Sequence, residues 1–546
     1  MNWRNSLKEG DIFLPFHFEK QSTFKYIIMN QLSLRLLAVA LLTALFNYFF
    51  WLEKFGINLL LFNTSLIVLL ACFNKRIFDT TSVRVALGLV VLTASMVIVY
   101  NSVISILVHL LCFFVLVGFL HRRELTSVGG ALWQYGLNGL MTSFEPLLLL
   151  TETKNTSNNK NHLLSKSVRI AQLLFIPIIV FAVFLLIFKM ANPIFSDMVA
   201  TPFSWLFEAI DRLFTDFSAG HLIFIIFGAC FIFSILFNWN RVNNLYKISP
   251  RPETITTPEK LNEHSVANEY RTALLLIVSV NILLLIVNII DIKFLWFNLG
   301  ADLKSAHELS KLVHEGTYLL MLSIVLSICI LLYYFRNELN FLPNNRWLLV
   351  AAYVWIIQNG FLIISVLLRN YEYITNYGLT HNRIAVCFFL LITAIGLILL
   401  WLKIRNRYSF LHLFKQASWG FLFTLVSFTL FDWDSIIARY NLSTQKAEDL
   451  DYEYLYSLSE RTLPILFDNK AKLEVSIRKD STNTTTEGEI NELYYKINNY
   501  LRDQKEYKWV SWDLSNSNAI YYFKDKKIEK PDTQPEFYVP PPRPRK

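Results

Sequence analysis

Long apolar runs with almost no charge recur along the first 430 positions of the chain. A bilayer core needs about 20 apolar residues for each helix that crosses it, and soluble cores seldom supply many such runs. The pattern therefore predicts an all-α integral membrane protein with about eleven transmembrane helices and a small α-rich soluble C-terminal tail. The expected spans are 36–52, 57–73, 85–100, 102–120, 170–188, 222–238, 272–290, 317–335, 347–367, 384–402 and 417–431.

The boundaries of these runs divide the chain into six segments. We expect a cytoplasmic N-terminal segment (1–35), a four-span membrane unit (36–120), a cytoplasmic amphipathic segment and linker (121–169), a seven-span membrane unit (170–431), an extracytoplasmic α-rich domain (432–525) and a disordered Pro-rich tail (526–546). Within the α-rich domain, 445–459 and 488–505 are expected to be helical, and 509–512 and 520–523 to be strands or packed turns.

Charge is scarce and unevenly placed. Charged residues make up 17% of the chain, against about 25% in a typical soluble domain. With the N-terminus inside, the inner loops and N-terminal segment hold 25 Lys and Arg and the outer loops 8, which is the bias that the positive-inside rule describes. An odd number of spans then places the tail outside the cytoplasm.

The net charge of +9 does not indicate nucleic-acid binding, because residues 432–546 hold 18 Lys and Arg against 20 Asp and Glu. The excess lies in the membrane loops, so the lipid bilayer is the expected partner and other envelope membrane proteins are candidates. The cysteines all fall in or beside apolar runs and imply no disulfide framework: Cys72, Cys112, Cys230, Cys329 and Cys387.

Polar side chains inside the spans are costly and invite an explanation. Asn281 and Asn288 lie seven residues apart, which places them on one face of a helix, and Gln358 and Asn359 interrupt the ninth span. Interhelical hydrogen bonding explains them, and a polar path for a substrate is the alternative. The spans carry no acidic or basic residue near their centres, which argues against coupling to an ion gradient.

The expected outer loops and the start of the tail bring together carboxylates, imidazoles and guanidinium groups. Such a set can bind a polar headgroup or catalyse transfer, or it can dock the tail on the membrane body through salt bridges. His307 and His314 lie seven residues apart, about 10 Å along a helix, so neither a metal site nor a cofactor is expected. The candidate binding residues are Asp291, His314, Glu315, Tyr377, His381, Arg383, Asp432, Asp434 and Arg439.

Several motifs resemble those of a family of bacterial polytopic membrane proteins. They are Asn192-Pro193-Ile194-Phe195, Asp291-Ile292-Lys293-Phe294-Leu295-Trp296, Val313-His314-Glu315-Gly316-Thr317-Tyr318, Tyr377-Gly378-Leu379-Thr380 with Arg383, the stretch from Phe431 to Leu442, Asp449-Leu450-Asp451-Tyr452, Leu463-Pro464 and Trp509-Val510-Ser511-Trp512-Asp513-Leu514-Ser515. The similar family is the domain of unknown function numbered four-one-seven-three, related to four-one-five-three, and the likeness covers about residues 165–515. It implies a bacterial inner-membrane location and no activity.

Two functions fit these expectations. The first is a non-enzymatic multispan protein that transports a small or lipid-linked solute, or organises or senses the cell envelope. The second is a membrane-embedded transferase that acts on a lipid-linked substrate at the extracytoplasmic face, with His314, Glu315, His381, Arg383, Asp432 and Asp434 as its candidate residues.

Overall fold

The structure is a computed structural model, and the part of the chain that it describes is mostly helical and contains no strand. The described residues are 16–73, 78–142, 219–237, 252–255, 263–293, 306–336, 338–342, 345–480, 486–526 and 528. The backbone alone is described at 16–32, 140–141, 219, 263–265, 306–317, 338, 480 and 486–490.

Six described helices are long and apolar enough to cross a membrane, which supports a multi-pass membrane protein. They are α1 (Phe16–Phe50), α3 (Thr81–Tyr100), α4 (Val103–His121), α11 (Glu263–Asp291), α13 (Arg346–Tyr377) and α14 (His381–Asn406). A seventh span results if α15 (Phe410–Phe428) and α16 (Trp433–Thr444), which meet at an angle of 57°, count as one broken span.

The expected count of about eleven spans is not confirmed. The apolar windows in α2 (Ile57–Phe73), α9 (Ala219–Leu236) and α12 (Ala306–Tyr334) are shorter than 18 residues, below the length that a bilayer core requires on average. The expected span 170–188 lies outside the described residues, and so does the motif at Asn192 to Phe195.

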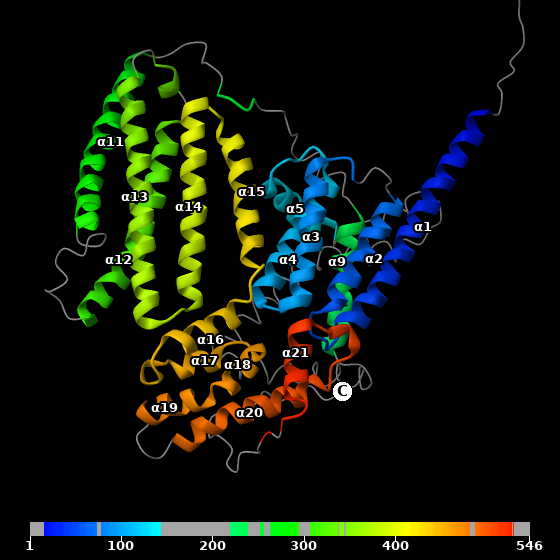
Figure 1. The fold of residues 1–546 in the computed structure, drawn as a ribbon. Helices are drawn as coiled ribbons and strands as arrows, with labels where there is room; N and C mark the ends of the chain where they lie inside the picture. Colours follow the sequence, from blue (N-terminus) through cyan, green and yellow to red (C-terminus); the bar gives the residue numbers. More distant parts are fainter. Residues whose placement is uncertain are drawn as a thin grey trace, which may run out of the picture. The chain divides into compact units, whose positions relative to one another are not determined.

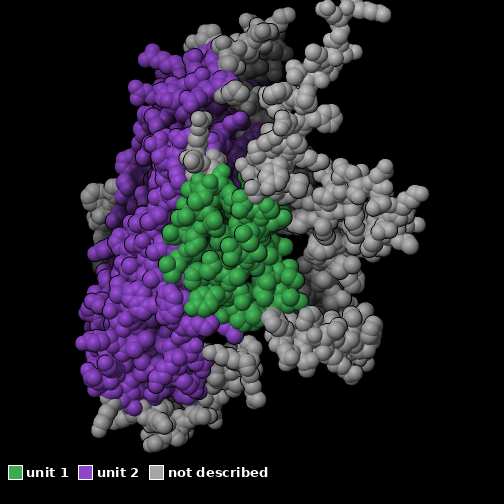
Figure 2. All heavy atoms as spheres, turned by 90° about the vertical axis from the view of Figure 1, so that its right-hand side faces the viewer, with its two compact units in different colours: residues 1–51, 61–75, 137–242 green, residues 52–60, 76–136, 243–546 purple. Residues whose placement is uncertain are grey.

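The chain forms two compact units, which Figure 2 colours separately. The smaller unit comprises residues 1–51, 61–75 and 137–242. Within it α1 packs against α9: the ring of Phe46 stacks on Phe224 at 4.8 Å between centroids, and His221 Nε2 lies 2.6 Å from the Asn47 amide oxygen. The larger unit comprises residues 52–60, 76–136 and 243–546 and contains the candidate site.

In the larger unit, α11 to α14 form an apolar bundle around residues such as Trp355 and Leu390 (Figure 1). Asn281 donates to the Ala351 carbonyl at 2.9 Å, and Asn288 donates to the Gln358 carbonyl at 3.2 Å. Both contacts join residues 70 positions apart. The register is therefore constant, and α11 and α13 run in the same direction.

The C-terminal helices form a second hydrophobic core around Leu455, Leu466, Ile497 and Tyr500. The segment 509–512 begins with a 3₁₀ turn and 520–523 belongs to a helix, so neither is a strand. The elements of this tail domain are α16, η4 (Ala447–Asp449), α17 (Tyr452–Ser457), η5 (Glu460–Thr462), α18 (Leu463–Asp468), α19 (Lys470–Asp480), α20 (Thr486–Gln504), η6 (Trp509–Ser511) and α21 (Leu514–Phe523).

Candidate functional site

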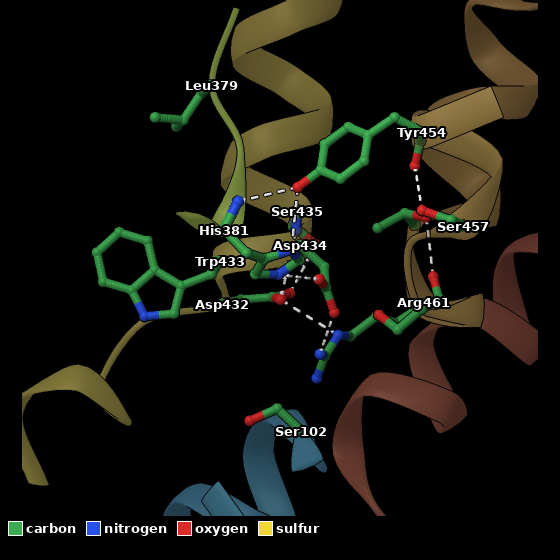
Figure 3. Close-up of polar contacts among 12 residues, drawn as sticks. Ser102, Leu379, His381, Asp432, Trp433, Asp434, Ser435, Tyr454, Ser457 and Arg461 are labelled. Atoms are coloured by element: carbon green, nitrogen blue, oxygen red, sulfur yellow. Dashed lines mark hydrogen bonds and ion pairs between the residues drawn. The ribbon is translucent and has the colours of Figure 1, made fainter. Parts of the chain in front are cut away.

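Asp434 is the centre of a buried polar network where the tail domain begins (Figure 3). Its Oδ1 lies 2.8 Å from Nε2 of His381, the first residue of α14, and its Oδ2 accepts from Nη2 of Arg461 in η5. Arg461 Nε lies 3.2 Å from Asp432 Oδ1. One guanidinium group thus bridges two carboxylates, while an imidazole from a different helix reaches the second of them.

The geometry of this network fixes the charge of Asp434. Burial alone would raise the pKa of the Asp434 carboxyl, but hydrogen bonds from His381 and Arg461 and the positive charge of Arg461 outweigh it and hold the pKa well below its ordinary value. The Arg461 side chain is only 7% exposed. Each charge therefore depends on its partner, because an unpaired buried charge is strongly destabilising.

Tyr454 of α17 extends the network on the far side of His381. Its Oη accepts from the His381 backbone N–H at 2.9 Å and lies 3.0 Å from His381 Nδ1. All partners are satisfied if His381 carries its proton on Nε2, donates it to Asp434, and accepts the Tyr454 hydroxyl proton on Nδ1. Burial raises the pKa of the Tyr454 hydroxyl, so the hydroxyl keeps its proton at neutral pH.

The turn between α13 and α14 is held by the same tail domain. The side-chain amide of Asn441 in α16 accepts from the Leu379 N–H at 2.6 Å and donates to the Leu379 carbonyl at 2.9 Å. Gly378 precedes it with φ +79°, and a Cβ there would lie 2.7 Å from the Asn441 amide oxygen. Only glycine satisfies both the backbone conformation and the close approach of the tail.

Two further loops of the larger unit receive the end of the tail. The Glu53 carboxylate accepts from the Lys508 N–H at 3.0 Å and the Ser511 hydroxyl at 2.8 Å. The Asn101 amide donates to Asp513 Oδ2 at 2.9 Å, and Arg461 donates to the Tyr100 carbonyl. Docking of the tail therefore uses the loops before α2, between α3 and α4, and between α13 and α14.

A pocket of about 470 Å³ borders the docking network. His381 and Tyr454 belong to both. Cationic and hydroxyl groups predominate among its described lining residues, none of which is acidic. The lining is Tyr318, Arg369, Asn370, Tyr373, Thr380, His381, Asn382, Arg383, Val386 and Tyr454.

Two of the polar residues inside the bundle join neighbouring helices. Asn281 and Asn288 join α11 to α13, and Asn359 donates to the Trp355 carbonyl one turn back in α13. The Gln358 side chain is 8% exposed. The pocket beside these residues, about 530 Å³, is lined by Gly360 and apolar side chains such as Ile356 and Leu397. No polar path is apparent among the described residues here.

The structure brings some of the sequence-predicted residues together and separates others. His381, Asp432 and Asp434 share one network, and Arg383 lines the adjoining pocket. Asp291 is 4% exposed and forms an ion pair with the pocket residue Arg369. Tyr377 and Arg439 are exposed on α13 and α16. His314 and Glu315 lie in α12, and their side chains lie outside the described residues.

Sequence reasoning missed Arg461, Tyr454, Asn441 and Arg369 as members of the site. Arg461 lies in a polar tract of ordinary surface composition, and Tyr454 in an aromatic tract that reads as core. Among the described residues, no group of three or more His, Cys, Asp or Glu side chains is placed to hold a metal ion.

Comparison with known proteins identifies a family and no activity. No curated protein and no solved structure matches the chain. Residues 86–469 match the family described as Domain of unknown function (DUF4153). This corrects the expected family number, four-one-seven-three, to that of its relative. The match also includes the expected third and fourth spans, which the sequence resemblance had left out. The chain belongs to the DUF4153 family.

Proposed function

We propose that this chain is a non-enzymatic multi-pass protein of the bacterial inner membrane that recognises a small or lipid-linked solute at the surface where its tail domain docks. The N-terminus is cytoplasmic and the tail domain extracytoplasmic in this proposal, as the distribution of Lys and Arg favours. Recognition there serves sensing or organisation of the envelope, or the first step of transport.

The observation that carries the proposal is the continuity between the pocket and the docking network. His381 lines the pocket and its imidazole contacts Asp434, and Tyr454 lines the pocket and its hydroxyl contacts His381. A solute in the pocket therefore touches the groups that hold the tail. Sensing is favoured over transport, because the amides of the bundle bond to neighbouring backbone carbonyls.

A transferase is the second candidate, and one feature favours it. Asp434, His381 and Tyr454 form a chain in which a carboxylate orients an imidazole beside a hydroxyl, an arrangement that serves nucleophilic catalysis in other proteins. The raised pKa of Tyr454 argues against it, since a nucleophile is activated by a lowered pKa or by an effective base.

Analysis of envelope lipids distinguishes the two candidates. Lipid extracts from cells that lack the chain are compared by mass spectrometry with extracts from cells that contain it, or that contain Tyr454→Phe. The non-enzymatic proposal expects no covalent lipid product to depend on the chain. A product that disappears without the chain, and in Tyr454→Phe at normal protein abundance, would establish the transferase instead.

A further inference from the structure

We infer that the pocket beside the docking network binds the phosphate group of an anionic ligand. This inference rests on the proposed function, because it names the class of solute that the same surface recognises. It follows from three features of the described lining: its excess of positive charge, its unused hydrogen-bond donors, and the N-terminus of a helix that forms part of the wall.

The pocket has an excess of positive charge. Arg369 is neutralised by Asp291, whose side chain is buried behind it. Arg383 donates to the Gly378 carbonyl and lies over the Tyr373 ring, 4.2 Å from the centroid. It forms no ion pair with a described side chain, and the Asp451 carboxylate attracts it only from beyond ion-pair distance. His381 shares its proton with Asp434. Since none of the described lining residues is acidic, Arg383 leaves a positive charge for an incoming anion.

Both arginines also have a hydrogen-bond donor that no described residue uses. The Nε of Arg369 and the Nε of Arg383 are buried and have no hydrogen-bond partner among the described residues. A buried donor without a partner costs about 1–3 kcal/mol, so a rotation of either guanidinium group that presents its Nε to a ligand oxygen recovers a penalty already present. Guanidinium groups suit phosphate because their fork of N–H groups matches two oxygens of one phosphate.

The first turn of α14 forms one wall of the pocket. Thr380, its N-cap residue, makes no side-chain capping bond. The backbone N–H of His381 is taken by Tyr454, and the N–H groups of Asn382 and Arg383 follow in the first turn. The first N–H groups of a helix have no partner within it, and their dipoles favour a negative charge, so such an end commonly binds phosphate.

Two sources can supply this phosphate: the headgroup of a membrane lipid, or a phosphorylated solute in water. Tyr318 and Val386 lie in the apolar parts of α12 and α14. The pocket therefore joins polar side chains at the start of α14 to apolar parts of two helices that are candidates to enter the membrane. The shared chemistry is the phosphate ester, and the two sources are separated by experiment.

Asn382→Asp tests the inference without removing a structural contact. Asn382 is exposed and lines the pocket. A carboxylate there repels an anion, yet in the first turn of a helix it is favourable to the fold. Asn406→Asp, at the other end of α14 and exposed, is the matched control. Arg383→Gln is the second variant and removes the uncompensated charge.

The full chain in detergent is titrated with inorganic phosphate, with short-chain phosphatidylglycerol and with short-chain phosphatidylcholine, and binding is followed by native mass spectrometry and by melting temperature. We expect phosphatidylglycerol or phosphate to bind at least tenfold more weakly to Asn382→Asp and to Arg383→Gln than to the wild type. Asn406→Asp should bind as the wild type does, and the melting temperature of Asn382→Asp without ligand should not fall.

Binding of phosphatidylglycerol alone identifies a lipid headgroup, and binding of phosphate in addition identifies a soluble anion as a competent ligand. The inference is overturned if neither binds, if phosphatidylcholine binds equally well, or if Asn382→Asp binds like the wild type. Such a failure leaves the proposed function standing with another solute, whereas a chain-dependent covalent change in the envelope lipids would overturn the proposed function alone.

Discussion

Tyr454 contacts His381 twice, through the backbone N–H at 2.9 Å and the imidazole Nδ1 at 3.0 Å. The two residues are 73 positions apart, one in the tail domain and one at the start of α14. Asp434 lies on the opposite side of the same imidazole. The tail domain therefore contacts both ring nitrogens of His381, through Asp434 at Nε2 and Tyr454 at Nδ1.

Removal of the Asp434 carboxylate should release the tail. In Asp434→Ala, Arg461 stays buried with only Asp432 as an acidic neighbour, and loss of one partner of a buried ion pair costs about 3–5 kcal/mol. The melting temperature of the full chain in detergent and the protease resistance of the tail should both fall. Asp449→Ala is the control: its carboxylate is 61% exposed beside Lys479, and such surface pairs contribute about 0–1 kcal/mol. Equal effects of the two substitutions would contradict the docking role.

Gly378→Ala should weaken the same contact through the backbone. A residue with a side chain is strained at φ +79° by about 1–3 kcal/mol, and its Cβ would approach the amides of Asn441 and Gln445 to 2.7 and 2.5 Å. Gly88→Ala in α3 is the control, because no atom lies within 4 Å of the added Cβ and alanine favours a helix by about 0.5–1 kcal/mol. The prediction fails if both variants melt at the wild-type temperature.

The stabilisation by Asp434 should depend on pH below about 4, the ordinary pKa of an aspartate in an unfolded chain. Because the folded pKa is lower, the contribution is complete above pH 4 and is lost as the pH falls towards the folded value. Melting curves of the wild type and Asp434→Asn should run parallel from pH 7 to 5. Below pH 4 the wild type should lose stability more steeply, and parallel curves there would refute the assigned shift.

Asn281→Leu and Asn288→Leu test the role of the amides inside the bundle. Each removes one bond to a carbonyl of α13, and hydrogen bonds between membrane helices contribute about 0.6 kcal/mol on average. We expect a small loss of thermal stability for each variant and a normal cellular phenotype. Full abundance with loss of the phenotype would show that the amides line a path for a solute.

The side of the membrane that carries the tail can be read from a pair of cysteine substitutions. Tyr521→Cys lies on the tail, where Tyr521 is 77% exposed, and Asn406→Cys lies at the far end of α14. An impermeant maleimide should label the first in intact spheroplasts and the second in inverted vesicles. Labelling in the reverse pattern would overturn the extracytoplasmic assignment.

How much of this fold can be predicted from the sequence depends on whether the interactions that determine each part are local or long-range. Apolar runs report a local requirement, the thickness of the bilayer, so helices such as α4 and α14 are visible in the sequence. The number of spans is less visible, because windows such as 57–73 and 318–334 are apolar yet shorter than the threshold for a span. Aromatic residues misled the expectation for 520–523, where Tyr521 and Tyr522 favour a strand by propensity but belong to a helix.

The sequence predicts members of the candidate site only where membrane topology alone places residues on the same side of the bilayer. The expectation that loops and the start of the tail share a face put His381 and Asp434 in one group, and the structure places them in contact. Arg461 and Asn441 carried no such signal, because their partners are set by how the tail domain packs on the loops. Tyr377 and Arg439 satisfied the same topological criterion, but they are exposed and do not join the network.

The contacts at Glu53 and Asn101 link residues 455 and 412 positions apart along the chain. Their partners, Lys508 and Asp513, are synthesised after all the described helices that could cross the membrane. The surface on which the tail docks is thus formed by the tips of hairpins whose helices are synthesised at very different times. A chain with one of these tips on the wrong side, or cut short before Lys508, presents an incomplete surface. Tail attachment therefore requires these hairpin tips and the segment around Lys508 and Asp513 to lie on the same side of the membrane.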